Sequence, residues 1–444
     1  MPQPDVATEI IVDLLRSAWV IERSRTDLFN GWSAHDPDFE RLTEQARTRA
    51  EVLGQALDRH ERDTDDELVK SHTEWLRSVT GATPDEVPLG AIFATRVGDW
   101  VVAHIAPFLD PAVAADLEAA AAIERSVVGL PSDLPGPPAF EPLDIPEVEA
   151  PGEVLFRFAI LSDMHIGSAE GERRVRAAID DINRAEVDLV IQLGDITDHG
   201  SNSEFARAVE VLSGLEPPVT TMMGNHDVYS TEESRLSGRE YFSASFGRDP
   251  DGVLLEHRGF RFAVLDSIEH GTSPFGPFDF MTGGFTEGAP GAVVRGSLTP
   301  PHHELLADVA APGGGPAFVF LHHPPQPFWG FPPILFGLRE ADAGRLHAVV
   351  DSGNVWGIFA GHTHRNARTR TYGTVVAQEV GIPRDFPFGY ALVDVAAEGY
   401  AYRFVQLSDE ALLRDAYEGA GHIHRRYGAG APEARAFSWK RPDH

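Results

Sequence analysis

The sequence predicts an α/β fold preceded by a separate helical domain. From about residue 153 onward, short apolar runs alternate with helical patterns, whereas residues 1–128 show helical spacing alone. The stretch 129–152 between them is rich in proline, a composition typical of a semi-rigid linker. We therefore expect a helical domain at 1–128, a linker at 129–152, an α/β domain at 153–407 and a C-terminal tail at 408–444.

The composition excludes several classes of partner. A chain of 444 residues with 42% hydrophobic and 24% charged side chains is typical of a globular protein. Its net charge of -31 argues against nucleic-acid polymers and anionic membranes, which bind basic surfaces. Because the chain has no cysteine, any metal must take nitrogen and oxygen ligands. Residues 1–13 lack a signal-peptide pattern, so we expect a cytoplasmic protein.

The helical domain shows amphipathic patterns from about residue 5, and then at 38–60, 65–79, 91–105 and 111–124. Glu22, His60 and His72 raise the alternative of a di-iron carboxylate bundle. Such bundles need Glu-x-x-His pairs, and residues 1–130 contain none. We interpret this part as a packing or regulatory domain, and we expect the tail to be helical and then irregular.

The α/β domain begins with three apolar runs, at 155–161, 188–193 and 219–223, separated by helical patterns near 175–182 and 205–212. This order predicts a right-handed βαβαβ unit. Further strands are expected at 253–256, 260–266, 317–321, 355–360, 374–379, 390–395 and 400–407, with helices near 299–311 and 338–351.

Polar residues of metal-binding type follow five of these strands. They are Asp163-Met164-His165, Gly194-Asp195-Ile196-Thr197-Asp198-His199-Gly200, Gly224-Asn225-His226-Asp227, His322-His323-Pro324-Pro325 and Gly361-His362-Thr363-His364. Each motif alone could be a turn. Because ligands bind at the carboxyl ends of strands in α/β sheets, the five together predict one edge that holds two metal ions.

These motifs resemble those of the calcineurin-like metallophosphoesterase superfamily over about residues 154–407. In style they are most similar to class III cyclic-nucleotide phosphodiesterases and related glycerophosphodiesterases. The resemblance implies a four-layer α-β-β-α sandwich. It also implies hydrolysis of a small-molecule phosphodiester by a metal-bridging hydroxide, with two divalent or mixed-valence transition metals such as Fe, Mn, Zn or Co.

The resemblance also implies a role for each ligand. Asp163, His165 and His364 would bind the first metal, and Asp195 would bridge both. The second metal would take Asn225, His362 and one histidine of the His322-His323 pair. We favour His322, because Pro324 stands two residues after it as in the family motif, and His323 would then lie on the substrate side.

Further residues are assigned to proton transfer and phosphate contact. His226 resembles the general acid of the family, and the Asp198 carboxylate would hold its imidazolium and raise its pKa. His199 stands where protein phosphatases of the superfamily have an arginine, which makes a phosphoprotein substrate less favoured. Arg365 would be either a phosphate contact or a solvated surface residue.

The sequence is also compatible with two other functions. The enzymatic alternative is a phosphomonoesterase, and the other class is a non-catalytic, metal-stabilised binding scaffold. The segments 271–296 and 326–336 are rich in aromatic residues. They are compatible with stacking on a substrate base, with a cap against the helical domain, or with a homo-oligomer contact.

Overall fold

The computed structural model describes residues 6–33, 38–58, isolated positions between 69 and 120, 140–228, 235–268 and 296–442. Within the last range, 312, 326–336, 339, 352, 373–374 and 420–427 are not described. The two aromatic segments therefore lie almost entirely outside the described residues, as do most of the helices expected after residue 60. The chain forms two compact units, with a chain boundary between Gly136 and Pro137.

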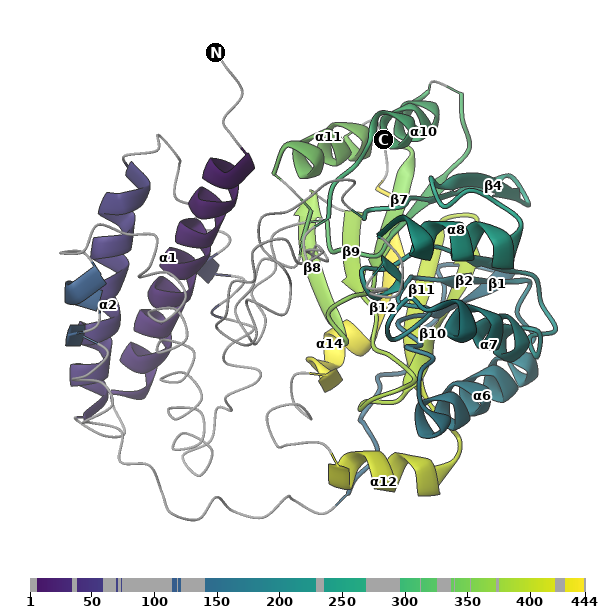
Figure 1. Cartoon of the computed structure of the whole chain (residues 1–444), viewed down its shortest axis with the longest axis horizontal. Coiled ribbons are helices and arrows are strands. Elements are labelled where there is room, and N and C mark those ends of the chain that lie inside the picture. Colours follow the sequence, from purple (N-terminus) through teal and green to yellow (C-terminus); the bar gives the residue numbers. More distant parts are fainter. Residues whose placement is uncertain are drawn as a thin grey trace. The chain divides into compact units, whose positions relative to one another are not determined.

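The first unit contains two long helices, α1 (Val6–Trp32) and α2 (Asp38–Asp58), which pack side by side (Figure 1). Their apolar faces bury Phe29 and Leu53, among others. The Glu22 carboxylate is also buried, but Arg25 lies 2.5 Å from it and Arg49 3.2 Å. Glu22 is therefore part of a buried ion-pair network, which does not favour the di-iron alternative at this position.

The first sheet of the second unit has the strand order β12-β11-β10-β1-β2-β3. Its strands are β1 (Val154–Leu161), β2 (Leu189–Gln192), β3 (Val219–Thr221), β10 (Gly389–Ala396), β11 (Gly399–Gln406) and β12 (Ala436–Lys440). The first three are parallel and are connected by α6 (Ala169–Arg184) and α7 (Asn202–Leu212), as the βαβαβ pattern predicts. Ser201 and Glu204 form a capping box that begins α7.

The second sheet has the order β4-β5-β6-β7-β9-β8. Its strands are β4 (Val253–His257), β5 (Phe260–Val264), β6 (Ala317–Leu321), β7 (Val355–Ala360), β8 (Ala367–Tyr372) and β9 (Val375–Glu379). β5, β6, β7 and β9 are parallel, so their carboxyl ends point to one edge. The helices α10 (Pro300–Ala310) and α11 (Glu340–Val350) precede β6 and β7.

The two sheets pack face to face through an aromatic core that includes Phe158, Phe262, Phe320 and Phe359. Helices α6 and α7 cover the outer face of the first sheet through a separate apolar cluster. A third cluster joins α10 and α11 to the outer face of the second sheet (Figure 1). This arrangement confirms the four-layer α-β-β-α sandwich.

The C-terminal segment differs from the sequence expectation. Helix α12 (Glu410–Gly419) is present as expected, but the expectation of an irregular end is wrong for residues 436–440. These residues form β12, which pairs with β11 and buries Phe437 and Trp439 in the core between the sheets. Helix α8 (Arg235–Phe246) and strand β8 were also not expected. None of the described helices is long and apolar enough to span a membrane.

Candidate active site

The seven predicted ligands lie together where five strands end. Asp163 and His165 follow β1, Asp195 follows β2, Asn225 follows β3, His322 follows β6, and His362 and His364 follow β7. Five of these residues have a left-handed backbone: Asp163, His165, Asp195, His362 and His364, with φ between 43° and 69°. Such strain costs about 1–3 kcal/mol for each non-glycine residue and is typical of functional sites. The unusual backbone conformation at the strand ends therefore directs these side chains toward one another.

Glycines allow the loops to approach one another closely. A Cβ atom on Gly224 would lie 2.1 Å from the Asp195 amide nitrogen. Gly194 has a φ of 86°, and a Cβ there would lie 2.8 Å from Nδ1 of His322. The glycines in the Gly-Asp and Gly-Asn-His-Asp motifs are therefore required by packing around the site.

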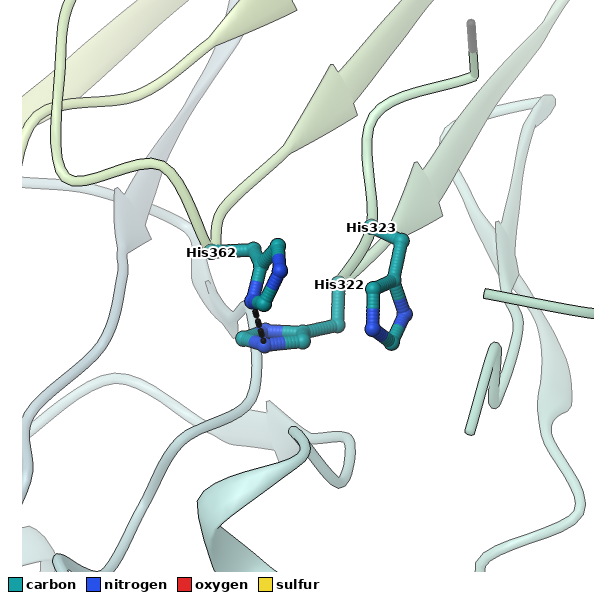
Figure 2. Close-up of side chains that lie close together, drawn as sticks. All are labelled: His322, His323 and His362. Carbon is teal, nitrogen blue, oxygen red and sulfur yellow. Dashed lines mark hydrogen bonds between the residues drawn. The ribbon is translucent and has the colours of Figure 1, made fainter. Parts of the chain in front are cut away.

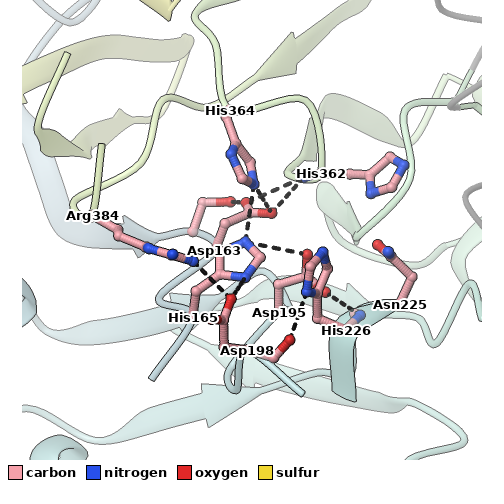
Figure 3. A network of polar contacts seen from close by, with 12 residues as sticks. Asp163, His165, Asp195, Asp198, Asn225, His226, His362, His364 and Arg384 are labelled. Atoms are coloured by element: carbon pink, nitrogen blue, oxygen red, sulfur yellow. Dashed lines mark hydrogen bonds and ion pairs between the residues drawn. The ribbon is translucent and has the colours of Figure 1, made fainter. Parts of the chain in front are cut away.

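The first donor cluster combines two carboxylates with two imidazoles. Nε2 of His165 lies 3.0 Å from Nε2 of His364 and 3.5 Å from Oδ2 of Asp195. Nε2 of His364 is 3.5 Å from Oδ1 of Asp163 (Figure 3). Nitrogen and oxygen atoms that converge in this way form a donor set suited to Zn, Fe, Mn or Co.

The second donor cluster is centred on His322. Its Nε2 lies 3.1 Å from Nδ1 of His362 (Figure 2). Nε2 of His322 is also 2.9 Å from Oδ1 of Asn225 and 3.4 Å from Oδ1 of Asp195. Its Nδ1 donates to the Leu193 carbonyl at 2.8 Å. This bond fixes the tautomer and leaves the Nε2 lone pair directed at the other donors, as in known histidine metal ligands.

His323 has different partners. Its Nδ1 is 2.9 Å from the hydroxyl of Ser267, and its backbone N–H donates to the same hydroxyl at 3.1 Å. The ring lies next to that of His362, with 4.6 Å between the ring centroids and an angle of 54° between the planes. The contacts with Asn225 and Asp195 are therefore made by His322, the histidine favoured from Pro324.

Asp195 lies between the two clusters, with one carboxylate oxygen toward His165 and the other toward His322. Burial, together with the negative charges of Asp163 and Asp227, raises its pKa well above the ordinary value. A buried carboxylate crowded by two others is best neutralised by a cation. The donor set thus fits two metal ions that share Asp195.

The contact between His226 and Asp198 differs from the expectation. Nδ1 of His226 donates to the backbone carbonyl of Asp198 at 2.8 Å. The Asp198 carboxylate instead accepts from Nη1 of Arg384 at 2.8 Å and lies 3.4 Å from Nδ1 of His165. Burial, and next the nearby His165, hold the pKa of His226 well below its ordinary value. Asp198 does act to raise the pKa of His226, through its carbonyl and its charge, but burial outweighs it, so the expected net rise is wrong for this arrangement.

The structure also shows the surroundings of His199 and Arg365, the two residues considered for phosphate contact. The His199 side chain is 70% exposed and faces Glu204 at 3.2 Å. Arg365 is buried and forms a double hydrogen bond with Glu379 at 2.7 and 3.0 Å. Arg365 is therefore neither a phosphate contact nor a solvated residue, since it ties the loop after β7 to the end of β9.

Asp227, which the sequence analysis did not assign, joins two ligand-bearing loops. Its carboxylate accepts from the amides of Ile196, Thr197 and Gly224 at 2.8–3.1 Å and from the Thr197 hydroxyl at 2.7 Å. These bonds connect the loop after β2, which carries Asp195, to the loop after β3. Asp227 thereby sets the spacing between Asp195 and Asn225.

An Asp227→Ala variant is expected to lose about 3 kcal/mol or more of unfolding free energy, because buried amides would lose their acceptor at about 1–3 kcal/mol each. Urea denaturation without added metal measures this loss. Asp227→Asn keeps one acceptor oxygen and should lose less. Equal losses in the two variants would contradict the assigned bonding.

The part of the chain that carries this site is similar to known proteins. Residues 156–366 match the family model of calcineurin-like phosphoesterases. A probable cyclic nucleotide phosphodiesterase of Rhodopseudomonas palustris is 27% identical over 55% of this chain and 82% of its own. A glycerophosphodiester phosphodiesterase of Enterobacter lignolyticus is 25% identical over 44% of this chain and 62% of its own.

Among solved structures, a dimetal phosphatase from Danio rerio is similar, with a TM-score of 0.42 and 17% identity over 57% of this chain and 98% of its own. The chain matches the calcineurin-like phosphoesterase family over residues 156–366, the part that carries all seven predicted ligands. It is a metal-dependent phosphoric ester hydrolase.

Proposed function

We propose that the site hydrolyses a phosphodiester bond of a small molecule, such as a cyclic nucleotide or a glycerophosphodiester, with two bound transition metals. The observation that best supports this proposal is the position of Asp195, whose two carboxylate oxygens face different donor clusters. A carboxylate shared between two clusters is typical of two-metal phosphoesterase sites.

The ligand assignment follows the two clusters. Asp163, His165 and His364 would hold the first metal, and Asn225, His322 and His362 would hold the second, with Asp195 shared. When bound, such ions act as Lewis acids that polarise phosphoryl oxygens and make water a better nucleophile at neutral pH. Fe, Mn, Zn and Co all suit these nitrogen and oxygen donors.

His226 supplies the proton for the departing alkoxide. Its Nδ1–H is fixed by the Asp198 carbonyl, so Nε2 is the atom that exchanges a proton. Burial keeps the free ring neutral, but the negative charge of a bound phosphate favours the protonated form. Asp198 positions two groups at once, because its carbonyl orients His226 while its carboxylate faces His165.

Substrate comparison tests this function. The metal-loaded protein should hydrolyse bis-p-nitrophenyl phosphate and a cyclic nucleotide or glycerophosphodiester faster than p-nitrophenyl phosphate. The relatives named as phosphodiesterases support this order. Turnover of the monoester alone would instead establish the phosphomonoesterase. A metal-loaded protein that hydrolyses none of these substrates would favour the binding scaffold.

Metal removal is expected to abolish turnover and to lower the melting temperature by about 3 °C or more, because a ligand present at 100 times its Kd stabilises by about 2.7 kcal/mol. The physical reason is that the buried carboxylates Asp163 and Asp195 then repel one another without a cation between them. Dialysis against EDTA followed by calorimetric melting measures this effect. Adding Mn²⁺ or Zn²⁺ should restore both quantities, and an unchanged melting curve would contradict the assignment.

A further inference from the structure

Arg384 lies at the open side of the site. The side chains of His364, Arg384 and Asp198 are 32%, 27% and 20% exposed, whereas Asp163, Asp195 and His322 are at most 1% exposed. Figure 3 shows Arg384 reaching Asp198 from the side of the site opposite Asn225. Arg384 therefore lies on a side of the site that solvent reaches.

The surrounding chain holds Arg384 in place. It belongs to the connection between β9 and β10, and its backbone carbonyl accepts from Nη1 of Arg174 on α6 at 2.9 Å. Its aliphatic stem lies beside Gly171, where an added Cβ would be 3.6 Å from Cγ of Arg384. The guanidinium thus projects from a fixed backbone toward the donor clusters.

The guanidinium uses only part of its hydrogen-bonding capacity within the described chain. Nη1 donates to Oδ1 of Asp198 at 2.8 Å, while Nε and Nη2 donate to none of the described residues. A guanidinium has five N–H donors in a planar fork that matches phosphate oxygens. Arg384 can therefore keep Asp198 and bind a second anion at the same time.

Arg384 adds a fixed positive charge on the exposed side of the site. The other side chains of the site are carboxylates, an amide and imidazoles, and the whole chain has a net charge of -31. Among the described arginines, Arg365 stands in the loop after β7, but it is buried and neutralised by Glu379. Arg384 is the arginine that the structure joins directly to a proposed catalytic residue, Asp198.

We propose that Arg384 binds a phosphoryl oxygen of the substrate and so determines the affinity of the site for phosphoesters. This inference rests on the proposed function. Arg384 and His226 bind the carboxylate and the carbonyl of the same residue, Asp198, so the phosphate contact and the proton donor are positioned together. Loss of the guanidinium should weaken substrate binding more than it slows the chemical step.

An Arg384→Gln variant tests the inference. Its KM for bis-p-nitrophenyl phosphate should rise about tenfold with kcat within about threefold of wild type, the size expected for one charged hydrogen bond. Its affinity for inorganic phosphate, measured by titration calorimetry on metal-loaded protein, should fall by a similar factor. Arg384→Lys, which keeps the charge but not the fork, should give intermediate values.

Arg207→Gln is the matched control, because Arg207 is also ion-paired, with Glu172 and Glu210, but lies on α7 at 46% exposure. Its phosphate affinity should equal that of wild type. Unchanged phosphate affinity in Arg384→Gln would overturn the inference. If Arg384→Gln instead loses its bound metal, the role of Arg384 is to hold Asp198 in position and not to bind phosphate. If wild type binds phosphate but hydrolyses no ester, the proposed function fails, while the phosphate titrations still decide the role of Arg384.

Discussion

An Asp195→Asn variant is expected to lose turnover by at least about a thousandfold, because Lewis-acid catalysis contributes several kcal/mol of transition-state stabilisation. Asparagine has nearly the same shape but replaces one carboxylate oxygen with an NH₂ group that cannot bind a cation. Since each oxygen of Asp195 faces a different cluster, the variant should keep one donor cluster and impair the other. Elemental analysis should show about half of the wild-type metal content.

Asp351→Asn is the control, since Asp351 is 69% exposed at the end of α11 and contacts His347. It should retain wild-type turnover, metal content and melting temperature. Full metal content in Asp195→Asn, with turnover near wild type, would contradict a shared carboxylate. It would favour two independent sites or a single metal.

A His226→Ala variant should lose about 10²- to 10⁴-fold in kcat, the range for general acid catalysis, while it retains its metal. The loss should depend on the leaving group. A p-nitrophenolate departs without much help, whereas an alkoxide needs a proton. The variant should therefore lose less activity on bis-p-nitrophenyl phosphate than on a glycerophosphodiester, and the ratio of the two losses is the quantity to measure.

His347→Ala is a matched control for this experiment, because His347 is a half-exposed histidine on α11 that faces Asp351. Its kcat should stay within about twofold of wild type, as for most exposed side chains. Equal losses on both substrates in His226→Ala would contradict a role as acid. A parallel loss of metal would assign His226 to the donor clusters instead.

The sequence was sufficient to predict the strands that lead into the site, because each is a short apolar run followed directly by a polar motif. Periodicity alone placed β1, β2, β6 and β7 to within two residues. It did not reveal β8, whose sequence Ala-Arg-Thr-Arg-Thr-Tyr lacks an apolar run, or β12, a five-residue strand near the end of the chain. Both are edge strands: β8 pairs with β9, the next strand in the sequence, and β12 pairs with β11. Their formation depends on these partners rather than on an apolar pattern of their own.

The contacts of the site were harder to predict than its residues. The family resemblance implied that Asp198 and His226 meet, but only the backbone path shows that the carbonyl, not the carboxylate, accepts the bond. Arg384 stands in a loop without a recognisable motif, 186 residues from Asp198. Asp227 follows His226 and could have been noted as the last residue of its motif, but its four hydrogen bonds depend on how two loops fold.

The two sheets contribute the ligands in nearly equal shares. Asp163, His165, Asp195 and Asn225 come from one sheet, and His322, His362 and His364 from the other. Metal affinity therefore depends on how the two sheets are aligned. A shift of one sheet against the other by one residue, about 3.3 Å, would separate the donor atoms. Core residues such as Phe158 and Phe320, whose rings pack against each other across the two sheets, keep that alignment. A substitution in this core is therefore expected to weaken metal binding before it unfolds the domain.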